Sequence, residues 1–266
     1  MFKKNPDGMR MEPTPERVLS VCRLIANKSL ARNEVHYAMT LGANGAAEID
    51  QINKSISVAL DEIGVIRAKD ELLELAVSEN VVQSPDTFRR YVSSIVFSQE
   101  DSTFVMFSKW VIGQNEKIVT HSNWEVLAKN CGREVSELSH LNENSALGWR
   151  FWASFLGLGY ISGSVILPNM KLRIQDILSH SFKDTFNCNE AILAADFISW
   201  LKGKLPEADL TGRMPLAVSA GLRTLHELEF IKLETWRDSN RIMLFHIDGE
   251  PINDFSHITV AEEVCK

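Results

Sequence analysis

The segment over residues 224–245, TLHELEFIKLETWRDSNRIMLF, changes its hydrophobic period near Phe230. Before this residue the leucines have helical spacing, and after it apolar and polar residues alternate, as in a strand that buries one face. The polar residues 237–240 are typical of a turn, and residues 241–247 are expected to run back as the second strand. The segment therefore predicts a helix that leads directly into a β-hairpin.

The same pattern occurs nearer the N-terminus, over residues 59–77, ALDEIGVIRAKDELLELAV. It predicts a strand, a polar turn and a second strand, with a continued helix as the alternative. Gly64, where a left-handed helix C-cap is expected, stands where Glu229 stands in the later copy. A fainter third copy covers residues 149–168. The cues recur about 95 and about 70 residues apart, which favours three related units over one continuous fold.

Helical periodicity extends over most of the remaining chain. Thr14 and Pro15 provide an N-cap and a first-turn proline, and Ser84 precedes a second proline-bearing helix start. Residues 133–144 predict either a loop or a surface helix. Helices are expected over 14–27, 31–40, 49–63, 84–95, 103–112, 123–131, 169–179 and 189–202.

Three short helices followed by a two-stranded wing form the winged helix-turn-helix arrangement, which residues 14–77 and 190–247 resemble. The resemblance rests on ALDEIGVI and LHELEFI, each followed by a polar hairpin. It implies a mainly α fold with small β-hairpin wings, built as tandem winged helix-turn-helix units around a helical middle region. The expected division is a flexible tail over 1–13, an N-terminal winged-helix domain over 14–80, a helical middle domain over 81–183, with a degenerate winged helix as the alternative, a C-terminal winged-helix domain over 184–250 and a tail over 251–266.

Two further resemblances concern the layout of the whole chain. The tandem arrangement and the aromatic run GWRFWASFLGLG at 148–159 resemble the DpdG-type subunit of bacterial restriction and defence systems associated with deazapurine-modified DNA. The architecture is also similar to that of the acidic tandem winged-helix subunits that clamp the kleisin of bacterial chromosome-organising complexes. Either resemblance implies a subunit of a larger DNA-handling assembly.

In winged-helix proteins the third helix usually enters the DNA major groove and the wing touches the backbone, although many members bind proteins instead. For the first unit this implies DNA contact through Gln51 and Lys54. The same helix face is expected to present Val58, and it carries Asp50 and Asp61, whose charges repel phosphate. The alternative is a solvated or partner-facing surface.

For the last unit the resemblance implies DNA contact through Arg223, on a helix face expected to be exposed together with Ser219 and Glu227. The wing adds three cations that are suited to phosphate: Lys232, Arg237 and Arg241. For Arg237 and Arg241 the alternative role is to solvate the hairpin tip or to pair with Asp238. A smaller basic cluster, whose ordinary reading is a solvated helix face, is Lys171, Arg173 and Lys183.

The formal net charge of -7 argues against a protein that coats nucleic acid non-specifically, because such binding depends on cations that neutralise phosphates. The aromatic residues of 149–160 are able to stack on bases, but their spacing favours a packed core. The four cysteines have no C-x-x-C pairing, so reduced, buried thiols are expected rather than a zinc cluster or disulfide framework. No secretory signal or membrane-spanning run is found, and a cytoplasmic location is expected.

The motifs of the common enzyme classes are absent from the sequence. It contains neither the phosphate-binding loop G-x-x-x-x-G-K-[ST], nor H-E-x-x-H, nor a G-x-S-x-G nucleophile elbow, and His226 and His246 alone make a weak metal site. We therefore expect a protein without catalysis, cofactor or metal.

The leading hypothesis is an adaptor or DNA-recognition subunit of a bacterial multi-protein DNA-processing or phage-defence complex. Its partners are then other protein subunits and double-stranded DNA, with no membrane. The alternatives are a purely protein-binding structural subunit and a stand-alone transcription regulator.

Overall fold

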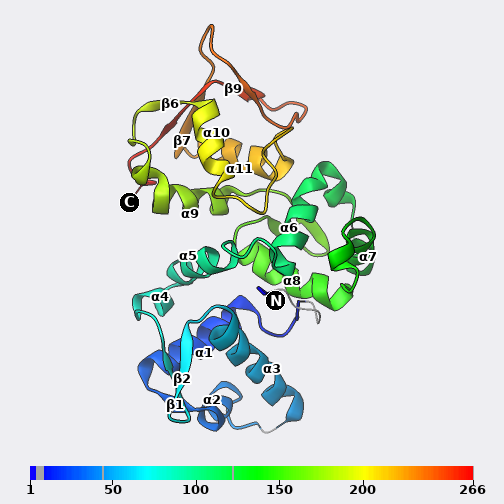
Figure 1. Cartoon of the computed structure of the whole chain (residues 1–266), viewed down its shortest axis with the longest axis vertical. Helices are drawn as coiled ribbons and strands as arrows, with labels where there is room; N and C mark the ends of the chain where they lie inside the picture. Colours follow the sequence, from blue (N-terminus) through cyan, green and yellow to red (C-terminus); the bar gives the residue numbers. More distant parts are fainter. Residues whose placement is uncertain (4–8, 44, 122, 266) are drawn as a thin grey trace. The chain divides into compact units, whose positions relative to one another are not determined.

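The computed structural model describes residues 1–3, 9–43, 45–121 and 123–265 (Figure 1). With 52% helix and 12% strand in small antiparallel sheets, it confirms a mainly helical chain with small β elements. The chain forms two compact units. The first combines Met1–Met106 with Trp124–Leu156, and the second combines Phe107–Asn123 with the chain from Gly157 onward. The expected division into three domains stays a prediction.

The first unit begins with the helices that the sequence predicts. Thr14 caps α1 (Pro15–Asn27), since its side chain accepts a hydrogen bond from the Arg17 amide, and Pro15 occupies the first turn. β1 (Leu30–Ala31), α2 (Arg32–Met39) and α3 (Ala46–Ser57) follow, and a π-helical turn, η1 (Val58–Glu62), extends α3. The helix face that the sequence predicts from a regular 3.6-residue period is therefore shifted from Val58 onward.

The first hairpin is confirmed, and the helical alternative for this segment is wrong. β2 (Ile66–Lys69) pairs antiparallel with β3 (Leu72–Leu75), and β1 adds to the other side of β3, so the strand order is β1-β3-β2. Asp70 and Glu71 form the connection with φ of 48° and 67°. Positive φ at both central residues is the turn geometry that matches the twist of a hairpin.

The rest of the first unit is helical. It contains α4 (Asn80–Gln83), α5 (Pro85–Val96), the start of α6 (Thr103–Gly113), α7 (Trp124–Glu134), the 3-10 turn η3 (Ser136–Leu138) and α8 (Glu143–Phe155). Trp149 and Trp152 of the aromatic run are fully buried in a packed core as expected, whereas the same expectation is wrong for Tyr160, which is 50% exposed. The indole of Trp152 donates to the Pro13 carbonyl at 2.7 Å, so α8 also holds the chain segment that leads into α1.

The second unit contains the end of α6, the 3-10 turn η2 (Asn115–Thr120) and a hairpin of β4 (Tyr160–Ser162) and β5 (Val165–Leu167). α9 (Lys171–Ser181) and the turn η4 (Phe182–Asp184) follow. Its main sheet combines β6 (Ala191–Leu193), β7 (Ile231–Glu234) and β10 (His257–Val260), and α10 (Ala194–Lys202) and α11 (Leu216–Glu227) contact these strands (Figure 1).

Two expectations for this unit are wrong. The helix expected over 189–202 starts only at Ala194, because residues 191–193 pair with β10 as β6. The expected hairpin also has a different partner: β7 pairs with β10, whereas β8 (Ile242–Met243) pairs with β9 (Asp254–Phe255). Residues 251–266, which we expected to form a tail, thus contain two strands.

The two units share one order of elements. α9-β6-α10-α11-β7-β10 repeats α1-β1-α2-α3-β2-β3, and the strand order β6-β10-β7 repeats β1-β3-β2. Gly64 and Glu229 hold the same place, two residues before β2 and β7, and both are left-handed, with φ of 63° and 60°. The copies differ in the connection between the last two strands. It consists of residues 70–71 in the first copy and of residues 235–256, here called the insertion, in the second.

Cys188 and Cys265 are joined by a disulfide, so the expectation of reduced thiols is wrong for these two residues. The sequence separation of 77 residues gave no spacing signal, because strand β10 brings them together only in the folded unit. Cys22 and Cys131 are buried and free as expected, and burial raises the pKa of each to about 12. Among the described residues, no helix is long and apolar enough to cross a membrane.

Candidate functional site

The predicted DNA-contact residues of the first unit lie on α3, where acidic side chains surround the cation. Lys54 Nζ is 2.7 Å from Glu12 Oε1 and 2.8 Å from Asp50 Oδ2. Hydrogen bonds to Asp50 and Glu12 raise the pKa of Lys54. Gln51 is half-buried, and Val58, expected on the same exposed face, is buried because the helix continues as a π turn. This face therefore presents little uncompensated positive charge.

The helix face of α11 that was expected to be exposed is covered by the insertion. Arg223 is only 4% exposed, and its Nε and Nη2 donate to the carbonyls of Ile252 at 2.9 Å and Phe245 at 2.8 Å. Ser219 is also buried and accepts a hydrogen bond from the Phe245 amide at 2.8 Å. The expectation of exposed Ser219 and Arg223 is wrong, because a segment distant in sequence folds over them. Glu227 alone is exposed as expected.

The three wing cations are exposed, and two of them face carboxylates. Lys232 Nζ is 2.8 Å from Glu234, and Arg241 Nη1 is 3.5 Å from Asp254 Oδ1. Arg237 lies at the exposed start of the insertion. These cations belong to the second unit with Arg223, whereas Gln51 and Lys54 belong to the first.

The basic cluster expected at Lys171, Arg173 and Lys183 does not form an open patch. Arg173 is buried, with Nε 2.7 Å from Glu207 Oε1, and Lys183 pairs with Glu262 at 3.0 Å. Glu207 is fully buried, and this burial raises its pKa, although Arg173 acts in the opposite direction. The pair is part of the core of the second unit.

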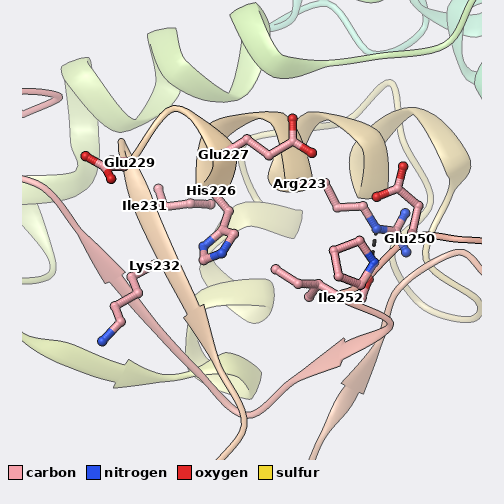
Figure 2. Close-up of a pocket in the computed structure, with 9 residues that line it drawn as sticks. Arg223, His226, Glu227, Glu229, Ile231, Lys232, Glu250 and Ile252 are labelled. Carbon is pink, nitrogen blue, oxygen red and sulfur yellow. Dashed lines mark hydrogen bonds between the residues drawn. The ribbon is translucent and has the colours of Figure 1, made fainter.

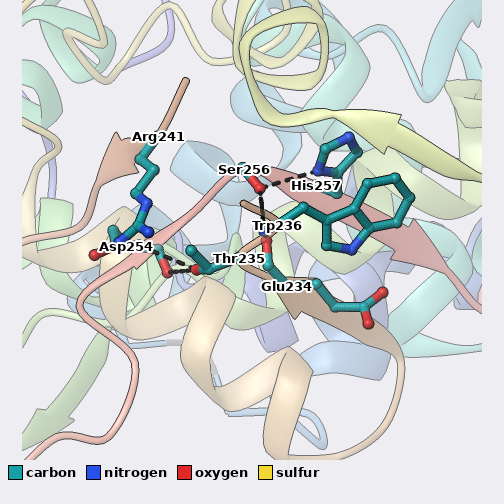
Figure 3. A network of polar contacts seen from close by, with 7 residues as sticks. All are labelled: Glu234, Thr235, Trp236, Arg241, Asp254, Ser256 and His257. Carbon is teal, nitrogen blue, oxygen red and sulfur yellow. Dashed lines mark hydrogen bonds and ion pairs between the residues drawn. The ribbon is translucent and has the colours of Figure 1, made fainter. Parts of the chain in front are cut away.

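A network of polar contacts closes the base of the insertion (Figure 3). At one end, Thr235 Oγ1 donates to Asp254 Oδ1 at 3.0 Å. Next to it, the Trp236 amide donates to Ser256 Oγ at 2.8 Å, and the Trp236 ring stacks on His257 with centroids 3.7 Å apart. The two ends of the insertion are thus held together, and the segment between them is directed over α11.

A cavity of about 670 Å³ lies where the insertion, α11 and β7 meet (Figure 2). One side chain at its edge is constrained: His226 Nδ1 accepts a hydrogen bond from the Leu233 amide at 3.1 Å. Burial lowers the pKa of Arg223, while the charge of Glu250 acts in the opposite direction. The lining residues are Arg223, His226, Glu227, Glu229, Ile231, Lys232, Glu250, Pro251 and Ile252.

Sequence reasoning missed this cavity because residues 250–252 had been assigned at the edge of a domain and in a tail. The run Gly249-Glu250-Pro251 contains turn residues, but no local feature of it indicates contact with α11. His226 and His246 do not meet: His226 bonds to β7, and His246 Nε2 lies 3.1 Å from Asp248. Within the described chain, no group of three metal-ligating side chains is present.

Comparisons with protein-family profiles, with curated proteins and with solved structures gave no match to this chain. The winged-helix resemblance and the two resemblances to larger assemblies therefore stay predictions.

Proposed function

We propose that the chain is a non-enzymatic, tandem winged-helix adaptor that holds a partner protein within a DNA-processing or defence assembly. The proposed units are α1 to β3 and α9 to β10, and the order of elements that they share supports this assignment. The main observation in favour of a protein-binding role is that the insertion covers one face of α11. Ser219 and Arg223, which lie on the face of α11 predicted to be exposed, bond to the insertion. This face is therefore not open to a DNA major groove.

Charge supports the same proposal in both units. DNA binding requires cations that replace counterions on phosphate. On α3, Glu12 and Asp50 already neutralise Lys54, and the cavity beside α11 is lined by three glutamates. Surfaces of this kind are better suited to polar and cationic groups of a protein than to a polyanion.

Contact of the wing with duplex DNA is the second candidate, and the exposure of Arg237 favours it. Arg241 is also exposed, and an exposed ion pair such as its contact with Asp254 at 3.5 Å contributes little stability. In this alternative the tip of the insertion touches phosphates while α11 stays covered.

Fluorescence anisotropy with a labelled duplex, at low and at physiological salt, distinguishes the two candidates. The adaptor proposal predicts no saturable binding at physiological salt. Saturable binding, with a salt slope that falls by about 2 in an Arg237→Ala, Arg241→Ala variant, would instead establish wing contact. Arg32→Ala, an exposed cation of the first unit, is the matched control.

Co-expression with the products of neighbouring genes, followed by size-exclusion chromatography with light scattering, tests the adaptor role directly. We expect a stable complex of defined stoichiometry that survives nuclease treatment. A chain that remains free of these products and binds duplex DNA would overturn the proposal.

A further inference from the structure

We infer that the cavity between α11, β7 and residues 250–252 receives an extended segment of the partner protein, in which apolar residues alternate with lysine or arginine. This inference rests on the proposed adaptor function and names the class of ligand that the site takes. Its volume of about 670 Å³ lies in the range of about 300 to 1,000 Å³ that is common for ligand sites.

β7 offers an edge to which an extended chain can add. It is an outer strand of the sheet β6-β10-β7. Phe230 bonds to Ala261 next to β10, so the alternation of an antiparallel pair directs the peptide groups of Ile231 and Leu233 away from β10. The Leu233 amide on this side already donates to His226 Nδ1 at 3.1 Å, so we expect the added chain to bond at Ile231. Ile231 lines the cavity, and strand addition at such an edge is a common mode of peptide recognition.

A buried donor in the lining requires an acceptor. Arg223 is 96% buried, and its Nη1 has no hydrogen-bond partner among the described residues, although Nε and Nη2 are both bonded. Leaving a buried charged donor unsatisfied is costly. In Figure 2 the guanidinium lies beside Glu250 and Ile252 at the edge of the cavity. A peptide carbonyl is a suitable acceptor for this group.

The charges of the lining select the side chains of the ligand. Glu227 and Glu229 are exposed and Glu250 is half-exposed. Of the two cations of the lining, Lys232 pairs with Glu234, and Arg223 is buried beside Glu250. Phosphate or an acidic peptide is repelled by three carboxylates, whereas lysine or arginine is attracted. Pro251 and Ile252 provide the apolar surface on which intervening side chains pack.

A random dodecapeptide display library selected on the full chain tests the inference. We expect enriched sequences that alternate apolar residues with lysine or arginine. The synthetic consensus peptide should bind about tenfold more weakly to a Glu227→Gln, Glu229→Gln, Glu250→Gln variant, since each exposed charge pair contributes about 0.5 kcal/mol. The matched control replaces three exposed glutamates of the first unit by glutamine, namely Glu16, Glu71 and Glu100.

Two further measurements sharpen the test. Bound peptide should slow amide hydrogen exchange at Ile231, and N-methylation of the central peptide bonds should abolish binding, because strand addition uses backbone hydrogen bonds. The inference is overturned by failure to enrich any sequence, by an acidic consensus, or by affinity that is equal in the cavity variant. It is also overturned by self-association of the chain that the cavity variant abolishes, which would place a second copy at the site.

The inference and the proposed function fail separately. If the chain forms a complex with neighbouring gene products but selects no such peptide, only the cavity assignment is lost. If it binds duplex DNA and no protein, the adaptor function itself is lost, whatever the peptide selection shows.

Discussion

The two copies of the helix-and-sheet arrangement differ most in how their last two strands are connected. In the first copy Asp70 and Glu71 make a tight turn between β2 and β3. In the second copy the insertion over 235–256 folds back over α11, where Phe245 and Ile252 bond to Arg223. The same order of elements thus supports two different surfaces.

This difference teaches that the connection, rather than the repeated core, determines what each copy is able to bind. A long connection costs little additional chain entropy, since the cost of loop closure grows only slowly with length. The insertion is also well anchored, because the network around Asp254 and Ser256 holds its two ends together. A covered helix and a new cavity result without any change in strand order.

The largest expected effect concerns the disulfide, which only the second copy has. Cys188→Ser should destabilise the second unit by about 4 kcal/mol, because the bond closes a long loop and restricts the unfolded chain. Hydrogen exchange followed by mass spectrometry should show faster exchange in β6 and β10. Exchange in β2 and β3 should stay as in the wild type.

Reduction of the wild-type protein is the control for this comparison. It should reproduce the exchange pattern of Cys188→Ser, whereas the free thiols Cys22 and Cys131 are buried and should not contribute. Equal loss of protection in β2 and β3 would show that the two copies do not unfold independently.

A smaller effect is expected at the two left-handed positions, which offer a matched pair. Gly64→Ala should destabilise the first unit by about 1 kcal/mol, because alanine is strained at a φ of 63° although its Cβ would meet no atom within 4 Å. Glu229→Gly should stabilise the second unit by up to about 1 kcal/mol for the same conformational reason. Urea unfolding of both variants measures the difference, and changes of the same sign would contradict the equivalence of these residues.

The smallest effect is expected at Lys54. It is the equivalent in the first copy of Ser219 in the second, because each precedes its left-handed residue, Gly64 or Glu229, by the same number of residues. Burial raises the pKa of Glu12, but its bond with Lys54 and a backbone hydrogen bond outweigh this, so the pKa is lowered. The stability that ionised Glu12 gives to the fold is therefore fully present above pH 4.5, the ordinary pKa, and is lost as pH falls through the lowered pKa. The pKa of Lys54 is raised, so its contribution is complete below 10.5 and is lost as pH rises through the raised value.

Lys54→Met should therefore lower the free energy of unfolding by about 0.5 kcal/mol near neutral pH and by less at either extreme. Chemical unfolding across this pH range measures the change, with the exposed Lys28→Met as the control. A loss that is independent of pH would show that the aliphatic part of Lys54, and not its charge, stabilises the unit.

Local signals made much of the helical part of the fold predictable. Capping residues identified the starts of α1 and α5, and the change of period identified β2, β3 and β7. Gly64 has the left-handed conformation expected at its position, and Glu229, which is aligned with it, has the same conformation. Each of these features depends on residues that are neighbours in sequence, so their chemistry is visible in the chain itself.

The candidate site was much less predictable. Lys232, Arg237 and Arg241 are exposed as expected, but Arg223 is buried under a segment that follows it by more than twenty residues. The sequence of a helix predicts which of its faces is exposed to solvent only if no segment distant in sequence covers that face. The choice of β10 as the partner of β7, and the pairing of Cys188 with Cys265, have the same cause.

Most helices, the caps of α1 and α5 and the two changes from helix to strand were thus predictable from the chain, because these features depend on local propensity and hydrophobic period. The pairing of β7 with β10, the closed face of α11 and the cavity beside Glu250 became visible only in the folded structure. Those outcomes depend on contacts between residues far apart in the chain. Such contacts form where they satisfy buried donors and cover apolar surface in the folded molecule as a whole.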